Sequence, residues 1–149
     1  MLDEPKISWL VKCPEDKKYS QDENFYAGSY NKRTDLELDF VIWNNKYGEE
    51  KVQDLKSFCI TVSFETLEDS SLLEYCIFEY RGKELSTSID DGVMSVVLPS
   101  DAFLSGGIND GTDQHTDNYI TLKMKLSVPK KYMIKANDLK TLLFNIVKI

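Results

Sequence analysis

Histidine and cysteine, the residues that most often carry metal and nucleophilic chemistry, are scarce in this chain of 149 residues. It has one histidine, His115, and three cysteines without the paired spacing of structural zinc sites. The Gly-x-Ser-x-Gly motif of serine hydrolases and the glycine loop that binds phosphate are absent as well. We therefore expect a protein that is not an enzyme, with no cofactor, no zinc and no catalytic role for His115.

The three cysteines are an odd number, which does not fit a disulfide framework. Cys59 and Cys76 fall in predicted strands, where a cysteine is usually a small buried hydrophobic residue. A bridge between Cys59 and Cys76 would require the fold to bring their strands opposite each other. We favour reduced thiols, as in a protein that folds in a cytoplasm.

Long apolar runs and basic clusters are also missing. No stretch of 18 apolar residues occurs, so we expect no transmembrane helix, and the acidic start of the chain does not resemble a secretory signal. The net charge is −7, from 25 acidic and 18 basic residues. An acidic surface repels phosphate backbones, and the sequence has no cluster of basic residues that would offset the negative net charge locally. We therefore expect neither nucleic acid nor membrane as a partner.

What the sequence does have is alternation of apolar and polar residues. In residues 118–128 every second residue from Ile120 to Val128 is apolar, and the residues between them are polar. Side chains alternate faces along a strand, so this segment predicts a strand with one apolar and one wet face. Such strands form antiparallel sheets whose apolar face is covered by a second sheet.

Further strands are predicted along the chain, with turns at roughly ten-residue intervals. Asp90-Asp91-Gly92 is a strong hairpin signal between two of these strands. The pattern predicts one all-β domain over 1–149, a two-sheet antiparallel β-sandwich of immunoglobulin-like or jelly-roll type with seven to nine strands. A tail at 1–6 and long loops at 14–34 and 105–118 complete it, with a short strand at Phe25 and Tyr26 as an alternative for part of the first loop. The remaining strands are predicted at 7–13, 35–43, 52–65, 72–80, 84–89, 93–98 and 139–149.

Aromatic residues are the candidate binding groups. The long connection at 14–34 carries four rings among charged neighbours, and two more rings lie at and after the end of the strand 35–43. Rings in such a loop either close the open end of the core or anchor a partner, because tyrosine and tryptophan are favoured at interface cores. The candidate partner-binding residues are Tyr19, Phe25, Tyr26, Tyr30, Trp43 and Tyr47.

The loop at 105–118 is rich in glycine and aspartate. Asn109, Asp110, Asp113 and Asp117 offer the oxygen ligands that calcium prefers, although they do not match the spacing of an EF-hand loop. Loops of this composition are most often simply hydrophilic. We keep these four residues as a weak calcium candidate and assign no other metal site.

Two segments carry a resemblance to a known class of modules. Residues 91–107, with a strand ending in Leu98-Pro99, are followed after a polar loop by the alternating strand from Tyr119. This layout, over roughly residues 84–128, resembles immunoglobulin-like and β-sandwich modules of tailed-bacteriophage structural proteins. The Cys…Trp…Cys signature of antibody domains is missing, and no binding residue is transferred from the resemblance.

The resemblance implies a non-enzymatic structural module of a virion, in a tail, baseplate, collar, head fibre or decoration. Its partners would be other virion proteins and copies of itself, and its location the virion, after folding in the host cytoplasm. The alternative is a small β-sandwich module that binds carbohydrate or peptide through its aromatic side chains.

Overall fold

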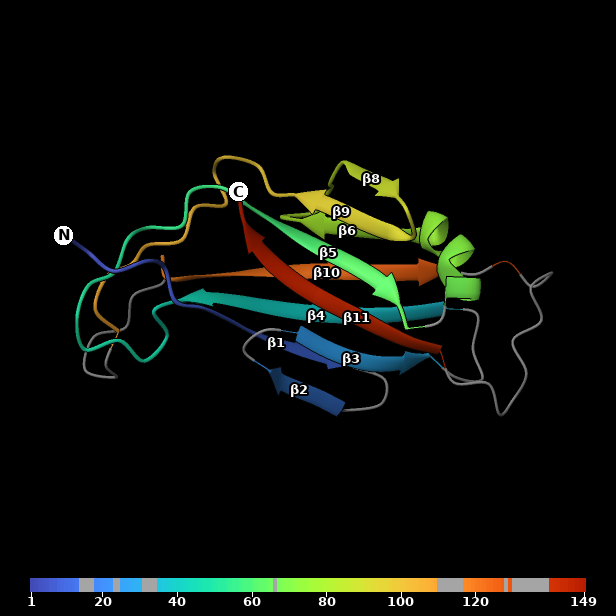
Figure 1. Cartoon of the computed structure of the whole chain (residues 1–149), viewed down its shortest axis with the longest axis horizontal. Helices are drawn as coiled ribbons and strands as arrows, with labels where there is room; N and C mark the ends of the chain where they lie inside the picture. Colours follow the sequence, from blue (N-terminus) through green and yellow to red (C-terminus); the bar gives the residue numbers. More distant parts are fainter. Residues whose placement is uncertain are drawn as a thin grey trace.

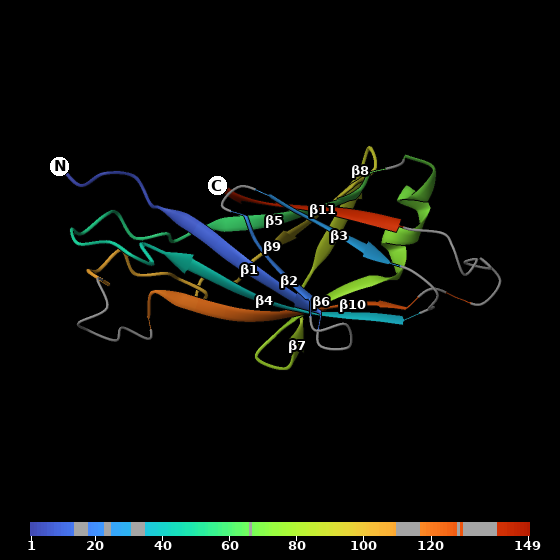
Figure 2. The same cartoon turned by 90° about the horizontal axis from the view of Figure 1, so that it is seen from below.

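The computed structural model shows a sandwich of two antiparallel sheets (Figures 1 and 2). This confirms the predicted all-β fold. Its backbone is described for residues 1–13, 18–22, 25–30, 35–65, 67–109, 117–127, 129 and 140–149. Its side chains are described for residues 1–11, 37–65, 70–109, 117–127, 129 and 142–149.

The first sheet has six strands in the order β2-β1-β4-β10-β6-β7. Its two longest strands, β4 and β10, pair over nine residues and form the middle of the sheet. The strands are β1 (Ile7–Cys13), β2 (Lys18–Asp22), β4 (Asp35–Asn44), β6 (Cys76–Tyr80), β7 (Lys83–Glu84) and β10 (Tyr119–Ser127).

The second sheet has five strands in the order β3-β11-β5-β9-β8. Its strand β5 lies in the middle, between β11 and β9. The strands are β3 (Phe25–Tyr30), β5 (Phe58–Phe64), β8 (Thr87–Asp90), β9 (Val93–Val97) and β11 (Lys140–Lys148).

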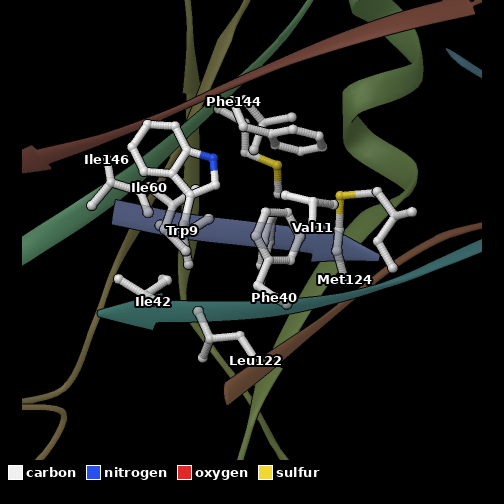
Figure 3. Packing of buried hydrophobic residues seen from close by; sticks show 14 of the residues in the cluster. Trp9, Val11, Phe40, Ile42, Ile60, Leu122, Met124, Phe144 and Ile146 are labelled. Carbon is white, nitrogen blue, oxygen red and sulfur yellow. The ribbon is translucent and has the colours of Figure 1, made fainter. Parts of the chain in front are cut away.

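The core lies between the two sheets and is formed by the apolar half of each alternating strand. Phe40 in β4 joins the layers: its ring centroid lies 5.0 Å from that of Phe144 in β11, with the rings edge to face, and 5.9 Å from that of Phe78 in β6. Figure 3 shows Trp9 and Met124 of the first sheet in the same cluster as Phe144. Burial of these faces is the main driving force for the sandwich.

The chain passes from one sheet to the other at both sides of the sandwich. On one side, β2 is the edge strand of the first sheet, and β3, which begins at Phe25, is the edge strand of the second. On the other side, β7 ends at Glu84 in the first sheet and β8 starts at Thr87 in the second. The single strand predicted at 84–89 is therefore wrong, because Leu85 packs against the core where the chain crosses.

The predicted strand at 72–80 is also wrong over its first half. A 3-10 helix, η1 (Leu67–Tyr75), precedes β6 and covers one end of the sandwich (Figure 1). The neighbouring side chains of Leu72 and Leu73 are both buried. A strand would send them to opposite faces, whereas a helical turn directs both toward the core.

The predicted long loop at 14–34 contains two edge strands, β2 and β3, and in this respect the prediction is wrong. β2 pairs with β1, and β3 pairs with β11. Backbone hydrogen bonds to one neighbour hold such edge strands, so they do not need the apolar alternation that marks a strand with a buried face.

Residues 52–57 are irregular instead of the start of a strand. Val52 and Leu55 are buried, and they form isolated bridges, Val52 with Asp3 and Leu55 with Leu104. The expected tail at 1–6 is therefore tied to the body of the protein. Among the described residues, no helix has the length and apolar character needed to cross a bilayer.

Candidate functional site

The end of the sandwich opposite η1 is built by loops that three buried asparagines hold together (Figure 1, left). The first of them, Asn44, is the last residue of β4 and is fully buried. Its Oδ1 accepts a hydrogen bond of 3.0 Å from the N–H of Lys6. Its Nδ2 donates to the carbonyl oxygens of Gln53 (3.0 Å) and Leu104 (3.3 Å). One side chain thus joins three segments that are distant in sequence.

Asn45 continues this arrangement from the turn that follows β4. Its φ is 57°, and its Nδ2 donates to the carbonyl oxygens of Glu50, Gly106 and Gly107 at 2.9–3.1 Å. The positive φ of this turn is thus at Asn45, a residue type that tolerates this conformation. Gly48 is needed in the turn because a Cβ there would lie 1.7 Å from the Asn45 Oδ1.

The third buried asparagine, Asn118, is the residue immediately before β10 and connects this strand to the same loops. Its Nδ2 donates to the carbonyl oxygens of Asn44 (3.2 Å) and Gly107 (3.0 Å), and its own carbonyl accepts from the Asn44 N–H (2.8 Å). Buried amides that donate to loop carbonyls satisfy these groups and connect the loops. We call the described loop segments held by Asn44, Asn45 and Asn118 the platform.

An aromatic cluster lies beside this platform. The ring centroids of Trp43 in β4 and Tyr119 in β10 are 4.6 Å apart. The Lys46 Nζ lies 5.3 Å from the centroid of Trp43 and 5.2 Å from that of Tyr47. These distances are those of cation–π contacts, which hold the ammonium group in place between the two rings.

A hollow of about 380 Å³ opens next to the cluster, between residues 6–8 at the start of β1 and residues 45–48 of the turn. Two lysines, Lys6 and Lys46, line it, and none of its lining residues is acidic. Tyr47 forms part of its wall with 79% of its surface exposed. The hollow is therefore a cationic and aromatic site on a chain whose net charge is −7. We call it the lysine–tyrosine hollow.

The structure brings together two of the predicted partner-binding residues, Trp43 and Tyr47. The sequence analysis missed Lys46 and Tyr119, which complete the cluster. Lys46 lies between the two predicted aromatic residues in the sequence and could have been noticed. Tyr119 could not, because only the pairing of β10 with β4 places it opposite Trp43.

The other four aromatic candidates lie in the two edge strands. In backbone register, Tyr19 of β2 is opposite Lys12, whereas Tyr26 and Tyr30 of β3 are opposite Phe144 and Lys140. Phe25 is opposite Asn145. The side chains of these four residues lie outside the described part of the chain, so their role as partner-binding residues stays a prediction.

The weak calcium candidate is described only in part. Asn109 donates its backbone N–H to the Gly48 carbonyl, and the Asp117 carbonyl accepts from the Ser105 N–H. The backbones of Asn109 and Asp117 thus form hydrogen bonds with loop residues at the platform. Asp110 and Asp113 lie outside the described residues, as does His115. In the described ranges, no group of three or more His, Cys, Asp or Glu residues is placed to hold a metal ion.

Cys59 and Cys76 are free thiols in different sheets. Cys76 points into the core from β6, and burial raises the pKa of its thiol to about 12. Cys59 alternates with the buried residues of β5 and is half-buried on the outer side, where partial burial also raises its pKa. The two side chains point to different sides of the sandwich, so the fold does not place them opposite each other for a bridge.

No protein-family model matches the chain, and no curated protein sequence matches it.

Proposed function

We propose that the chain is a non-enzymatic interaction module, and that it binds an acidic segment of a neighbouring protein in the lysine–tyrosine hollow. The observation that carries this proposal is the pairing of Lys6 and Lys46 in one hollow without an acidic lining residue. On an acidic chain, such a site attracts carboxylates while the rest of the surface repels them.

The construction of the hollow supports a contact role. Tyrosine and tryptophan are enriched at interface cores, and here Tyr47 is exposed beside the packed pair of Trp43 and Tyr119, whose rings are tilted by 36°. Lys46 is held over two rings before any partner arrives. Less side-chain entropy is then lost on binding, which favours affinity.

The setting we propose is the particle of a tailed bacteriophage, in which such modules join neighbouring subunits. The support is the resemblance of residues 84–128, where β9 ends before Leu98-Pro99 and β10 follows as the long alternating strand. The partners would be other virion proteins, and the mechanism complementarity of surfaces.

The test is a titration of the ¹⁵N-labelled chain with a peptide of four glutamates, blocked at both ends, and in parallel with a peptide of four serines. We expect saturable amide shifts confined to residues 6–8 and 45–48, with the glutamate peptide only. The Lys46→Gln variant should bind about tenfold more weakly, since a charge-assisted contact is lost. Lys51→Gln is the matched control, because Lys51 is exposed and does not line the hollow.

Two results would contradict the proposal. One is the absence of saturable shifts at millimolar glutamate peptide. The other is an equal loss of affinity in the Lys46→Gln and Lys51→Gln variants, which would indicate unspecific attraction between charges.

The exposed ring of Tyr47 favours a second candidate function, the binding of a sugar. A ring with 79% of its surface exposed offers a face on which a pyranose can stack. A glycan array in which Tyr47→Ala removes the signals and Lys46→Gln does not would favour this function over the binding of acidic peptide.

A further inference from the structure

The two outer faces of the sandwich differ in charge. Five of the outward side chains on the three strands β4, β10 and β6 of the first sheet are charged, and four of them form two ion pairs across strands. Lys123 contacts Glu37 at 2.7 Å, and Lys125 contacts Glu79 at 3.1 Å. The hydrogen bond from Lys123 holds the pKa of the Glu37 carboxyl below its ordinary value. This face is typical of a sheet surface adapted to water.

Over the described side chains of β11, β5 and β9, three of the five strands of the second sheet, the outer face is uncharged. Asp90 of the edge strand β8, which pairs with Val93, borders this area. Alternation with the buried residues identifies nine outward side chains, none of which is acidic or basic. In a chain with 29% charged residues, this is an unusual surface. The nine residues, here called the uncharged face, are Cys59, Thr61, Ser63, Val93, Ser95, Val97, Leu143, Asn145 and Val147.

The apolar members of the uncharged face include one continuous row. Val97, Cys59 and Val147 are direct neighbours across β9, β5 and β11. Val97 is 57% exposed and Val147 is 41% exposed, so the described chain does not cover this row. Exposed apolar rows on a flat sheet mark interaction surfaces.

We propose that the uncharged face is the contact surface of a symmetric dimer of this chain. Two copies that each carry a net charge of −7 repel each other, and a close approach is least unfavourable where neither copy presents charge. In a dimer with a twofold axis through this face, both copies contact each other through the same patch. Neither copy then presents charged side chains of this patch at the contact. The proposal extends the interaction role proposed above but uses a different surface, so it can be tested independently.

The size of the face fits a weak dimer. Its three strands, about 4.8 Å apart and about 20 Å long, cover roughly 290 Å², or about 600 Å² for two copies. This is the size of a weak, transient contact and is below the standard size of specific interfaces. Four of the nine residues are serine, threonine or asparagine, so the face also remains soluble in a monomer. We therefore expect a concentration-dependent dimer with a dissociation constant in the micromolar range.

Thr61 provides the test, because it lies in the middle of β5, the central strand of the sheet. Near a twofold axis, a lysine there would meet the lysine of the other copy. Sedimentation velocity of the full chain at 5–500 µM under reducing conditions should show a dimer that Thr61→Lys weakens at least tenfold, since two like charges would be desolvated together. Thr61→Val should strengthen it.

Thr121→Lys is the matched control: it introduces the same change on an outward position of β10, in the centre of the charged sheet. It should leave the dimer unchanged. Circular dichroism and melting curves of the three variants verify that each is folded.

Salt supplies an independent readout. The affinity of the dimer should increase between 50 mM and 500 mM NaCl, because salt screens the repulsion between the charged residues of the two copies outside the contact. Binding of glutamate peptide in the lysine–tyrosine hollow should weaken over the same range. A monomer at every concentration would overturn the proposal. So would a dimer that persists in folded Thr61→Lys, which would point to contact through a sheet edge.

Discussion

Trp43 of β4 and Tyr119 of β10 are directly opposite each other in the first sheet, and their ring centroids lie 4.6 Å apart. The pair connects the central strands of the fold to the candidate site, because Lys46 is held against the same tryptophan. A substitution at this pair should therefore affect stability and binding together.

The coupling of this pair can be measured by a double-mutant cycle with Trp43→Ala and Tyr119→Ala. Packed aromatic pairs contribute about 1 kcal/mol beyond the area that they bury, so the double variant should be about 1 kcal/mol more stable than the two single losses predict. Urea unfolding followed by circular dichroism gives the free energies. Strict additivity would show that the two rings stack without stabilising the sheet.

Asn44 should be the most sensitive polar position of the platform. Asn44→Ala removes three hydrogen bonds of a fully buried side chain and leaves the Lys6 N–H and the Gln53 and Leu104 carbonyl oxygens without this partner, so we expect a loss of about 3 kcal/mol in the free energy of unfolding. Amide exchange at Val52 and Leu55 should accelerate as well. Gln53→Ala is the control, because its side chain makes one exposed hydrogen bond, to the Leu2 carbonyl. A similar loss in both variants would contradict the role assigned to Asn44.

Gly106 and Gly107 form a matched pair for steric packing. A Cβ at Gly106 would lie 2.0 Å from the Val52 carbonyl oxygen, whereas a Cβ at Gly107 would lie 3.3 Å from the Ser105 Oγ. Gly106→Ala must therefore displace backbone and should destabilise the protein by about 3 kcal/mol, against less than about 1 kcal/mol for Gly107→Ala. Thermal unfolding of the two variants measures the difference. Equal melting temperatures would refute the close approach of these loops.

The buried thiol of Cys76 predicts a loss of stability at alkaline pH. Burial raises its pKa from the ordinary value of 9.0 to about 12. Between these values the unfolded chain has released this proton and the folded chain retains it, so stability falls as the pH rises. The slope between pH 9.5 and 10.5 should be steeper in the wild type than in Cys76→Ala, by up to about 1.4 kcal/mol per pH unit.

Two checks accompany this measurement. Below pH 8 the slopes of the wild type and of Cys76→Ala should agree, because the thiol is then protonated in both states. Cys59→Ala should change the alkaline slope less, since Cys59 is only half-buried. An unchanged slope in Cys76→Ala would mean that the thiol reaches solvent in the folded protein.

The strands with one buried face could be predicted from the sequence, because burial imposes a period of two on them. β1 has the predicted bounds, and β10 and β11 differ from the predictions by a residue or two at their ends. The hairpin at Asp91-Gly92 was also recognisable, since both residues adopt the positive φ that such turns require.

Features that depend on partners far away in the sequence could not be predicted. The edge strands β2 and β3 are recognised by their pairing with β1 and β11, and the burial of Leu72 and Leu73 together distinguishes η1 from a strand. In the candidate site, Trp43 and Tyr47 were recognisable as aromatic residues near a turn. The approach of Lys6 depends on its hydrogen bond to Asn44, which connects residues 38 positions apart.

The passage of the chain between the sheets at both sides has a consequence for how the protein unfolds. The chain connects β2 to β3 at one edge of the sandwich and β7 to β8 at the other. Neither sheet can therefore separate from the other by rotating about one edge. Partial opening is then confined to the two ends, where η1 and the asparagine-bound loops lie. The strands between them should melt in one all-or-none transition, and their slowest amides should exchange only through it.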